Sequence, residues 1–332
     1  MKQRLTTEEY AAGIARGDRV ILGKALTLLE SDLPEDQKQS ATLINQLLDK
    51  TGNAIRIGIT GVPGVGKSTF IEAFGKHVTS LDKRLAVLTI DPSSQLTKGS
   101  ILGDKTRMED LARNPKAFIR PSASGKTLGG VAGKTREAIL LCEAAGYDVI
   151  VIETVGVGQS EVAVKNMVDF FLLLMLAGAG DELQGIKKGI MEMADALVIT
   201  KADGDNIKRA TEAQADYKHA LHLFPPHASG QTPNVLTCSA LTNTGIEEVW
   251  KTITNHHDVI KQSGYLTENR KQQNIAWFTE RFDQLIKNDL QHYPVVSEKL
   301  AELEKLAAGQ KISAYEAAQQ LLSHYHQAVK KS

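Results

Sequence analysis

The chain has 332 residues, of which 42% are hydrophobic and 23% charged, so it can bury one substantial core and a smaller second one. Its 39 basic and 39 acidic side chains cancel, which excludes a strong overall field toward nucleic acid or anionic membranes. The spacing of Cys142 and Cys238 indicates neither a metal site nor a disulfide framework. The polar start "MKQRLTTEEY" is unlike a signal peptide, and the most apolar run, Phe170–Gly180, is too short to span a bilayer. A cytoplasmic protein is expected.

The pattern of apolar and polar residues changes twice along the chain. Residues 1–52 carry apolar side chains at helical spacing, with Thr7 as a candidate cap and Gly52 as a helix stop, and form a predicted helical arm. Between residues 53 and 262, short apolar runs alternate with longer helical or Gly-rich stretches, and each run predicts a strand: "IRIGIT", "LAVLTID", "DVIVIET", "FFLLLMLA", "ALVIT" and "NVLTCSA". That alternation is typical of a mostly parallel sheet covered on both faces. Residues 263–332 show helical spacing only, so we expect a C-terminal helical region.

The stretch "IRIGITGVPGVGKSTF" contains a phosphate-binding loop. The pattern Gly61-x-x-x-x-Gly66-Lys67-Ser68 follows a predicted strand and opens a predicted helix, which is the required context. Its backbone N–H groups can surround phosphate oxygens, Lys67 can neutralise the β- and γ-phosphates, and Ser68 can offer a hydroxyl to Mg²⁺. The predicted fold is an α/β P-loop NTPase with a mostly parallel sheet flanked by helices, plus N- and C-terminal helical extensions. The loop residues predicted to bind nucleotide are Gly61, Val62, Pro63, Gly64, Val65, Gly66, Lys67, Ser68 and Thr69.

Three carboxylates are candidates for the metal and for hydrolysis. Asp91 and Glu153 end apolar strands, and Asp104 lies in the polar loop "GSILGDKTRMED". A carboxylate at the carboxyl end of a parallel strand faces the ligand crevice of such sheets. We therefore predict a metal site of Ser68 with these three carboxylates, and a catalytic group of Lys67 with the same three.

A switch-like segment, "ETVGVGQSE", begins at Glu153. The spacing Glu153-x-x-Gly156 resembles an element in which a carboxylate serves the metal and a glycine amide meets the γ-phosphate. Such a loop can be ordered by the γ-phosphate and released on hydrolysis. Gln159 is a switch candidate that could orient water, although a surface glutamine fits its position equally well.

Two later segments indicate guanine recognition. In "TKAD", Asp203 can accept hydrogen bonds from guanine N1–H and from its exocyclic amine, and Lys201 can lay its methylene stem along the base. In "CSAL", the Ala240 amide can donate to guanine O6, and Ser239 and Leu241 flank it. Adenine would leave the Asp203 carboxylate facing an acceptor, which is costly in a buried site. The segments "TKAD" and "CSAL" follow the phosphate loop and the switch-like segment along the chain, and a GTPase has these elements in the same order.

At this point the chain resembles a known family. "GVPGVGKST", "TIDPSS", "GSILGDKTRM", "LCEAAGYDVIVIETVGVGQSE", "GAGDELQGIKKGIMEMAD" and "CSAL" together look like the ArgK/MeaB-type GTPases. The resemblance implies a homodimeric, Mg²⁺-dependent GTPase that cycles between GTP and GDP. It also implies that the protein assists an adenosylcobalamin-dependent acyl-CoA mutase, usually methylmalonyl-CoA mutase, by gating cofactor delivery and protecting the enzyme. Within "GDELQGIKKG", Lys187 would be a further switch residue, and the C-terminal helices would form the dimer interface.

Thr200 stands where the guanine-specific motif has asparagine. An asparagine amide there would link base N7 to the phosphate loop, and the shorter threonine is expected to lose that contact. We therefore expect GTP affinity to be weaker by about one neutral hydrogen bond, roughly 0.5–1.5 kcal/mol. Base choice should not change, because Asp203 discriminates.

Three other functions remain open from the residues alone. A small-molecule kinase shares the phosphate loop and would need a lid with arginines, for which Arg107, Arg113 and Arg120 are available. A nickel-type metallochaperone would need metal-binding clusters, and the only histidine groups, His256–His257 and His324 with His326, fit polar helix faces. A module that holds nucleotide without turnover would not need the three carboxylates.

Overall fold

The computed structural model describes residues 4–90, 108–121, 128–154, 160–178, 188–225, 227–292 and 294–329. Five predicted site residues lie outside these ranges: Asp91, Asp104, Gly156, Gln159 and Lys187. The chain divides into two compact units, residues 1–273 and residues 274–332.

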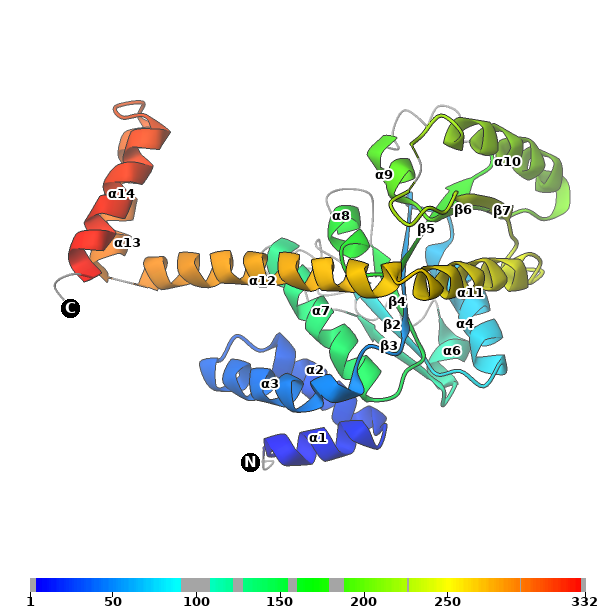
Figure 1. Cartoon of the computed structure of the whole chain (residues 1–332), viewed down its shortest axis with the longest axis horizontal. Helices are drawn as coiled ribbons and strands as arrows, with labels where there is room; N and C mark the ends of the chain where they lie inside the picture. The colour runs from blue at the N-terminus through cyan, green and yellow to red at the C-terminus, as the bar shows by residue number, and fades with distance from the viewer. Residues whose placement is uncertain are drawn as a thin grey trace. The chain divides into compact units, whose positions relative to one another are not determined.

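The first unit is built on a seven-stranded sheet in the order β3-β2-β4-β1-β5-β6-β7, with every pair of neighbours parallel (Figure 1). The parallel α/β class predicted from the alternating texture is confirmed. Its strands are nearly all buried because helices cover both faces, which is why they read as continuous apolar runs. The strands are β1 (Ile55–Gly61), β2 (Leu85–Ile90), β3 (Ala117–Pro121), β4 (Val149–Thr154), β5 (Phe170–Leu176), β6 (Ala196–Thr200) and β7 (Asn234–Thr237).

Two hydrophobic clusters lie on opposite faces of the sheet, and alternate residues of one strand feed each of them. In β4, for example, Ile150 and Ile152 join one cluster, while Val149 and Val151 join the other. The first face is covered by α7 (Leu128–Ala144), α8 (Ser160–Lys165), α9 (Lys188–Met193) and α10 (Ile207–Leu221). The second is covered by α4 (Lys67–Ser80), α6 (Glu109–Arg113) and α11 (Ile246–Gln262).

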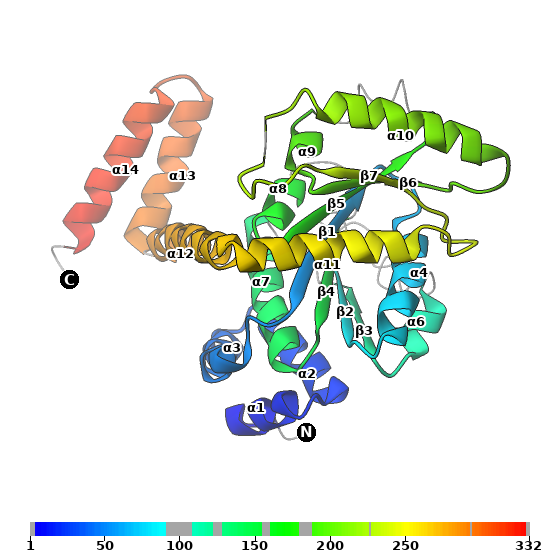
Figure 2. The same ribbon diagram turned by 45° about the vertical axis from the view of Figure 1, so that its right-hand side comes forward.

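The N-terminal helices pack on α7 within the first unit, and Figure 2 shows them grouped beside it. The Thr6 hydroxyl accepts from the Glu9 amide at 3.2 Å, and the Glu9 carboxylate accepts from the Thr6 amide at 2.7 Å. This reciprocal capping box makes Thr6 the cap, so the expectation of Thr7 is wrong by one position. The helices are α1 (Thr7–Ala15), α2 (Arg19–Glu30) and α3 (Pro34–Leu47), followed by the short 3₁₀ turn η1 (Leu48–Lys50).

Arg270 fastens the beginning of α12 (Tyr265–His292) to the first unit. Its guanidinium donates to both carboxylate oxygens of Asp169, at 2.8 and 2.6 Å, and to the carbonyl oxygens of Gly52 and Ala54 at 2.6 Å each. Nearby, Arg56 pairs in the same bidentate way with Glu143. The first unit therefore includes the first residues of α12 and ends at residue 273.

The second unit consists of the remainder of α12 with α13 (Pro294–Ala308) and α14 (Ala314–Val329), and the last two helices pack on each other. On this part of α12, five large apolar side chains between Ile275 and Ile286 recur at helical spacing and are exposed. In the part of the chain that the structure describes, no helix is both long enough and apolar enough to cross a membrane.

Candidate nucleotide-binding site

The phosphate loop joins β1 to α4 at the carboxyl edge of the sheet, as predicted. Gly61 has a φ of 155°, and a Cβ there would lie 2.6 Å from the Leu174 carbonyl oxygen. Gly66 has a φ of 93° and forms the N-cap of α4. Glycine is required at both positions, because an L side chain would be strained at either backbone conformation.

Lys67, the first residue of α4, folds back over this loop. Its ammonium donates to the Gly61 carbonyl oxygen at 2.7 Å and lies 3.4 Å from that of Val62. Burial lowers the pKa of Lys67, while the negative charges of Glu153 and Glu161 act in the opposite direction. The lysine is thus held on the loop beside two carboxylates, where it can neutralise a phosphate that enters.

Ser68 and Glu153, two of the four predicted metal groups, lie together. The Ser68 hydroxyl donates to the Glu153 carboxylate at 3.3 Å, and both side chains are buried. A hydroxyl and a carboxylate are the hard oxygen ligands that Mg²⁺ prefers, so these residues fit the ion. The Thr154 hydroxyl donates to that of Thr60 at 2.8 Å, which fixes the ends of β4 and β1 beside the pair.

The predicted base-reading residues lie at the ends of β6 and β7. Lys201 has a φ of 57°, and its ammonium donates to the Gly64 carbonyl oxygen at 2.9 Å. The Ser239 hydroxyl donates to the Asp203 carboxylate at 2.5 Å, and the Ala202 amide donates to the Cys238 carbonyl oxygen at 3.0 Å. Asp203 is therefore held in place by the "CSAL" segment, while Lys201 ties its loop to the phosphate loop.

A cavity of about 190 Å³ lies between the base-reading and phosphate loops. It brings together residues that are far apart in sequence and that were predicted from separate motifs. Phe70 and Cys238 also line it, although neither was among the predicted binding residues. The lining residues are Val65, Gly66, Thr69, Phe70, Thr200, Lys201, Asp203, Cys238, Ala240 and Leu241.

Thr200 makes a contact that the sequence did not predict. Its side chain is buried, and its hydroxyl lies 2.7 Å from the Val65 carbonyl oxygen and 3.2 Å from that of Met175. The link from residue 200 to the phosphate loop, which the shorter threonine was expected to lose, is therefore present, while the loss of the contact to base N7 stays a prediction. The threonine hydroxyl reaches the phosphate loop directly and keeps the two segments together.

Two other residues differ from expectation. Glu161, in the first turn of α8, is fully buried; it ends the segment "ETVGVGQSE" but was not among the predicted site residues. An acidic residue in a short segment between two apolar runs was the available signal. His256, expected on a polar helix face, is instead buried and packs edge-on against Phe170, with ring centroids 5.0 Å apart. Among the described residues there is no group of three or more His, Cys, Asp or Glu that could hold a metal by itself.

This combination of phosphate loop, hydroxyl–carboxylate pair and adjoining cavity on a parallel sheet defines a P-loop nucleotide-binding protein. The chain belongs to the methylmalonyl-CoA mutase-associated GTPase family MeaB, whose family model matches residues 22–294. The resemblance to ArgK/MeaB-type GTPases is thereby confirmed.

Relatives support the same assignment. GTPase ArgK of Escherichia coli K12 is 48% identical over 290 residues, which cover 87% of this chain and 88% of the relative. A mouse protein named methylmalonic aciduria type A homolog, mitochondrial, is 42% identical over 334 residues, covering 98% of this chain and 80% of the relative. The crystal structure of an LAO/AO transport system kinase matches with a TM-score of 0.78 at 38% identity, covering 98% of this chain and 99% of the other.

Proposed function

We propose that the chain is a Mg²⁺-dependent GTPase that converts GTP to GDP and phosphate and acts as a chaperone for an adenosylcobalamin-dependent acyl-CoA mutase. One observation carries the nucleotide part of this proposal. Asp203, held by Ser239, lines the same cavity as the phosphate-loop residues Val65 and Gly66. A single ligand with a base at one end and phosphates at the other fits this arrangement.

Guanine is the base that suits the cavity. The Asp203 carboxylate offers two acceptor oxygens, and guanine presents two donors, N1–H and the exocyclic amine, on one edge. The hydrogen bond from Ser239 at 2.5 Å fixes the carboxylate before the base arrives, which reduces the entropy lost on binding. Lys201 would cover the base face with its methylene groups while its ammonium stays on Gly64.

The phosphate end is assigned to residues at the carboxyl edge of the sheet. Lys67 would move from its own loop carbonyls to the β- and γ-phosphates. Ser68 and Glu153, with Asp91 and Asp104, would hold Mg²⁺, which when bound neutralises charge on the phosphate oxygens. We assign Gly156 to the γ-phosphate and Gln159 and Lys187 to nucleotide-sensitive switching.

A homodimer is proposed from the surface of α12. Five large apolar side chains recur at helical spacing and are between 44% and 70% exposed. Two of them, Phe278 and Phe282, stack with their ring centroids 6.1 Å apart. An exposed apolar stripe of this kind is typical of a surface that another chain covers. The stripe consists of Ile275, Phe278, Phe282, Leu285 and Ile286.

The client is proposed from the family alone. The matching family is described as associated with methylmalonyl-CoA mutase, and the mouse relative is named for methylmalonic aciduria. We propose a cytoplasmic location. The identity of the client is tested by a pull-down from an extract of the native host. The chain is immobilised with a slowly hydrolysed GTP analogue, and the retained proteins are identified by mass spectrometry. A cobalamin-dependent mutase supports the proposal, and a urease or hydrogenase subunit contradicts it.

A small-molecule kinase is the second candidate, because the solved relative carries the name of a transport system kinase. The two reactions differ in their product. The purified chain incubated with Mg²⁺ and GTP should release inorganic phosphate, and Lys67→Ala should abolish the release. Consumption of GTP without release of phosphate, with a phosphorylated small molecule in its place, would favour the kinase.

A further inference from the structure

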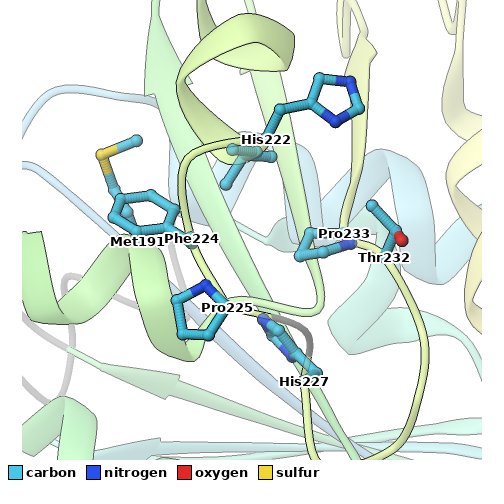
Figure 3. A pocket seen from close by; sticks show the side chains of 8 residues that line it. Met191, His222, Phe224, Pro225, His227, Thr232 and Pro233 are labelled. Carbon is cyan, nitrogen blue, oxygen red and sulfur yellow. The ribbon is translucent and has the colours of Figure 1, made fainter.

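A second cavity, of about 210 Å³, lies beside the amino end of β7, toward the edge of the sheet opposite the phosphate loop (Figure 3). None of its lining residues lines the nucleotide cavity. The wall of this second cavity is mainly apolar, and it comes from α9, from the end of α10 and from the segment between α10 and β7. The apolar residues of the wall are Met191, Leu221, Phe224, Pro225 and Pro233.

The volume of the second cavity suits one aromatic ring. An apolar cavity of about 150 Å³ in another protein binds benzene. Sites for drug-sized ligands are larger, at about 300–1,000 Å³. A volume of about 210 Å³ therefore leaves room for a benzene ring with one or two small substituents and for little more. The Met191 thioether and the Phe224 ring are both partners that an aromatic ring prefers.

His227 offers a polar group to a ligand in this cavity. Its imidazole points toward Pro225 and Pro233 among the lining side chains (Figure 3), and its side chain is 12% exposed. The Nδ1 atom lies 3.3 Å from the carboxylate of Asp195, which directly precedes β6. Within the described part of the chain, Nε2 has no hydrogen-bond partner. One ring nitrogen is thus engaged by the protein, and the other remains for a ligand.

Asp195 determines which hydrogen-bonding role His227 has toward a ligand. Its buried carboxylate accepts from the Phe171 amide and from the Lys165 ammonium at 2.7 Å each. Burial alone would raise the pKa of Asp195, but His227 and Lys165 outweigh it and lower that pKa, so the carboxylate is ionised. An ionised carboxylate can only accept, so His227 carries its proton on Nδ1. In the neutral imidazole Nε2 is then an acceptor, and a ligand must offer it a donor.

We propose that the second cavity is a binding site for a single phenol ring, whose hydroxyl donates to His227 Nε2 while the ring lies against the apolar wall. This site is separate from the proposed nucleotide chemistry and does not depend on it. A ring without a hydroxyl would take water away from Nε2 without replacing its hydrogen bond. A ring with a carboxylate would place an acceptor against an acceptor. A free small phenol and the tyrosine side chain of a partner protein both present the required chemistry.

Nuclear magnetic resonance of the full chain with methyl-¹³C methionine measures binding at this cavity. The signal of Met191, which lines it, is assigned by its loss in Met191→Leu. p-Cresol should shift that signal to saturation and should bind more tightly than p-xylene, which has a methyl group in place of the hydroxyl. His227→Leu should lower the preference for p-cresol over p-xylene by roughly 2- to 12-fold, the value of one neutral hydrogen bond.

His222→Leu is the matched control. His222 lines the same cavity, but its ring points away from His227 (Figure 3), so this variant should keep the wild-type preference. If His227→Leu does not fold, His227→Phe gives the same comparison. The inference is overturned if p-cresol does not shift the Met191 signal to saturation or if the preference is unchanged in the His227 variant. Tighter binding of 4-methylbenzoate than of p-cresol would also overturn it.

N-Acetyltyrosinamide distinguishes the two sources of the ring. Tighter binding of this compound than of p-cresol, measured on the same Met191 signal, would assign the site to a tyrosine side chain of a partner protein. Weaker binding would assign it to a free small phenol. Nucleotide enters none of these titrations, so a failure of the proposed function leaves their outcome unchanged.

Discussion

The Thr200 hydroxyl lies 2.7 Å from the carbonyl oxygen of Val65 and joins the base-reading strand to the phosphate loop. Lys201, the next residue, makes a second connection to the same loop at the Gly64 carbonyl oxygen, 2.9 Å away. Two adjacent side chains thus fix the spacing between the end of β6 and the phosphate loop, on either side of the cavity proposed for the nucleotide. A nucleotide that enters a site of fixed spacing loses less free energy to ordering the protein.

Removal of the Thr200 hydroxyl should weaken GTP binding. Thr200→Val keeps the shape of the side chain but leaves the buried Val65 carbonyl oxygen without this donor. The net value of such a hydrogen bond is about 0.5–1.5 kcal/mol, or roughly a 2- to 12-fold loss of affinity. Calorimetric titration with GTP measures it, and Thr200→Ser, which keeps the hydroxyl, is the control. Equal affinities of the valine and serine variants would show that the contact does not matter for binding.

Thr200→Asn should restore the guanine-specific motif and tighten GTP binding without changing base preference. The added amide can reach base N7, which is worth about one neutral hydrogen bond, roughly 0.5–1.5 kcal/mol. Calorimetric titration with GTP measures the gain in affinity, and the same titration in the presence of ATP as competitor measures the base preference. No gain in affinity would mean that the hydroxyl on Val65 already replaces the asparagine contact.

His256 should make the protein less stable in mild acid. Burial lowers its pKa from 6.5, while Asp195 acts in the opposite direction, so the folded state holds it neutral to lower pH than the unfolded state does. Below about pH 6.5 the unfolded chain binds the extra proton, and the free energy of unfolding falls by at most about 1.4 kcal/mol per pH unit. Urea unfolding at pH 7.5 and 5.5 measures the fall.

The His256→Gln variant removes this titration. Its loss of stability between the two pH values should be smaller than that of the wild type, although not zero, because burial also lowers the pKa of His257. An equal or larger loss in the variant would assign the acid sensitivity to other groups.

Arg270 should contribute strongly to the stability of the first unit. Arg270→Ala leaves the buried Asp169 carboxylate and the Gly52 and Ala54 carbonyl oxygens without this partner, and breaking a buried pair in this way costs about 3–5 kcal/mol. Urea unfolding of the full chain gives the value. Arg281→Ala, an exposed arginine on the same helix, should cost less than about 0.5 kcal/mol. A similar loss in the free energy of unfolding for the two variants would contradict a stabilising role for the Arg270–Asp169 ion pair.

The sequence was sufficient to predict the elements that depend on local patterns. The apolar runs predicted six of the seven strands, and only β3 was missed. β3 lies at the edge of the sheet and ends in Arg120 and Pro121, so it has neither the continuous apolar run nor the full pairing of a central strand. The phosphate loop was predicted because its backbone requires glycine and lysine at fixed spacing, and Asp203, predicted from a separate motif, lines a cavity with residues of that loop.

Contacts between distant segments were not predictable in the same way. The direction of the Thr200 hydroxyl depends on how closely the phosphate loop approaches β6, across 135 residues of sequence. The close approach of α8 to β1, where a Cβ on Gly58 would lie 2.7 Å from Val164, follows from helix–sheet packing and not from the sequence of α8. Polar side chains with short reach are informative in a sequence only when their neighbours are known.

Competition among GTP, ATP and xanthosine triphosphate for the wild type and for Asp203→Asn tests guanine recognition most directly. In the wild type GTP should displace ATP and xanthosine triphosphate, because only guanine offers two donors to the carboxylate. Asp203→Asn should lose about 10- to 100-fold in GTP affinity, the value of one hydrogen bond to a charged group, and should favour xanthosine triphosphate, whose second carbonyl can accept from the new amide. Asp205→Asn, at an exposed neighbour, should behave as the wild type does. Equal competition by GTP and ATP for the wild type, with no change in Asp203→Asn, would contradict guanine recognition by this site.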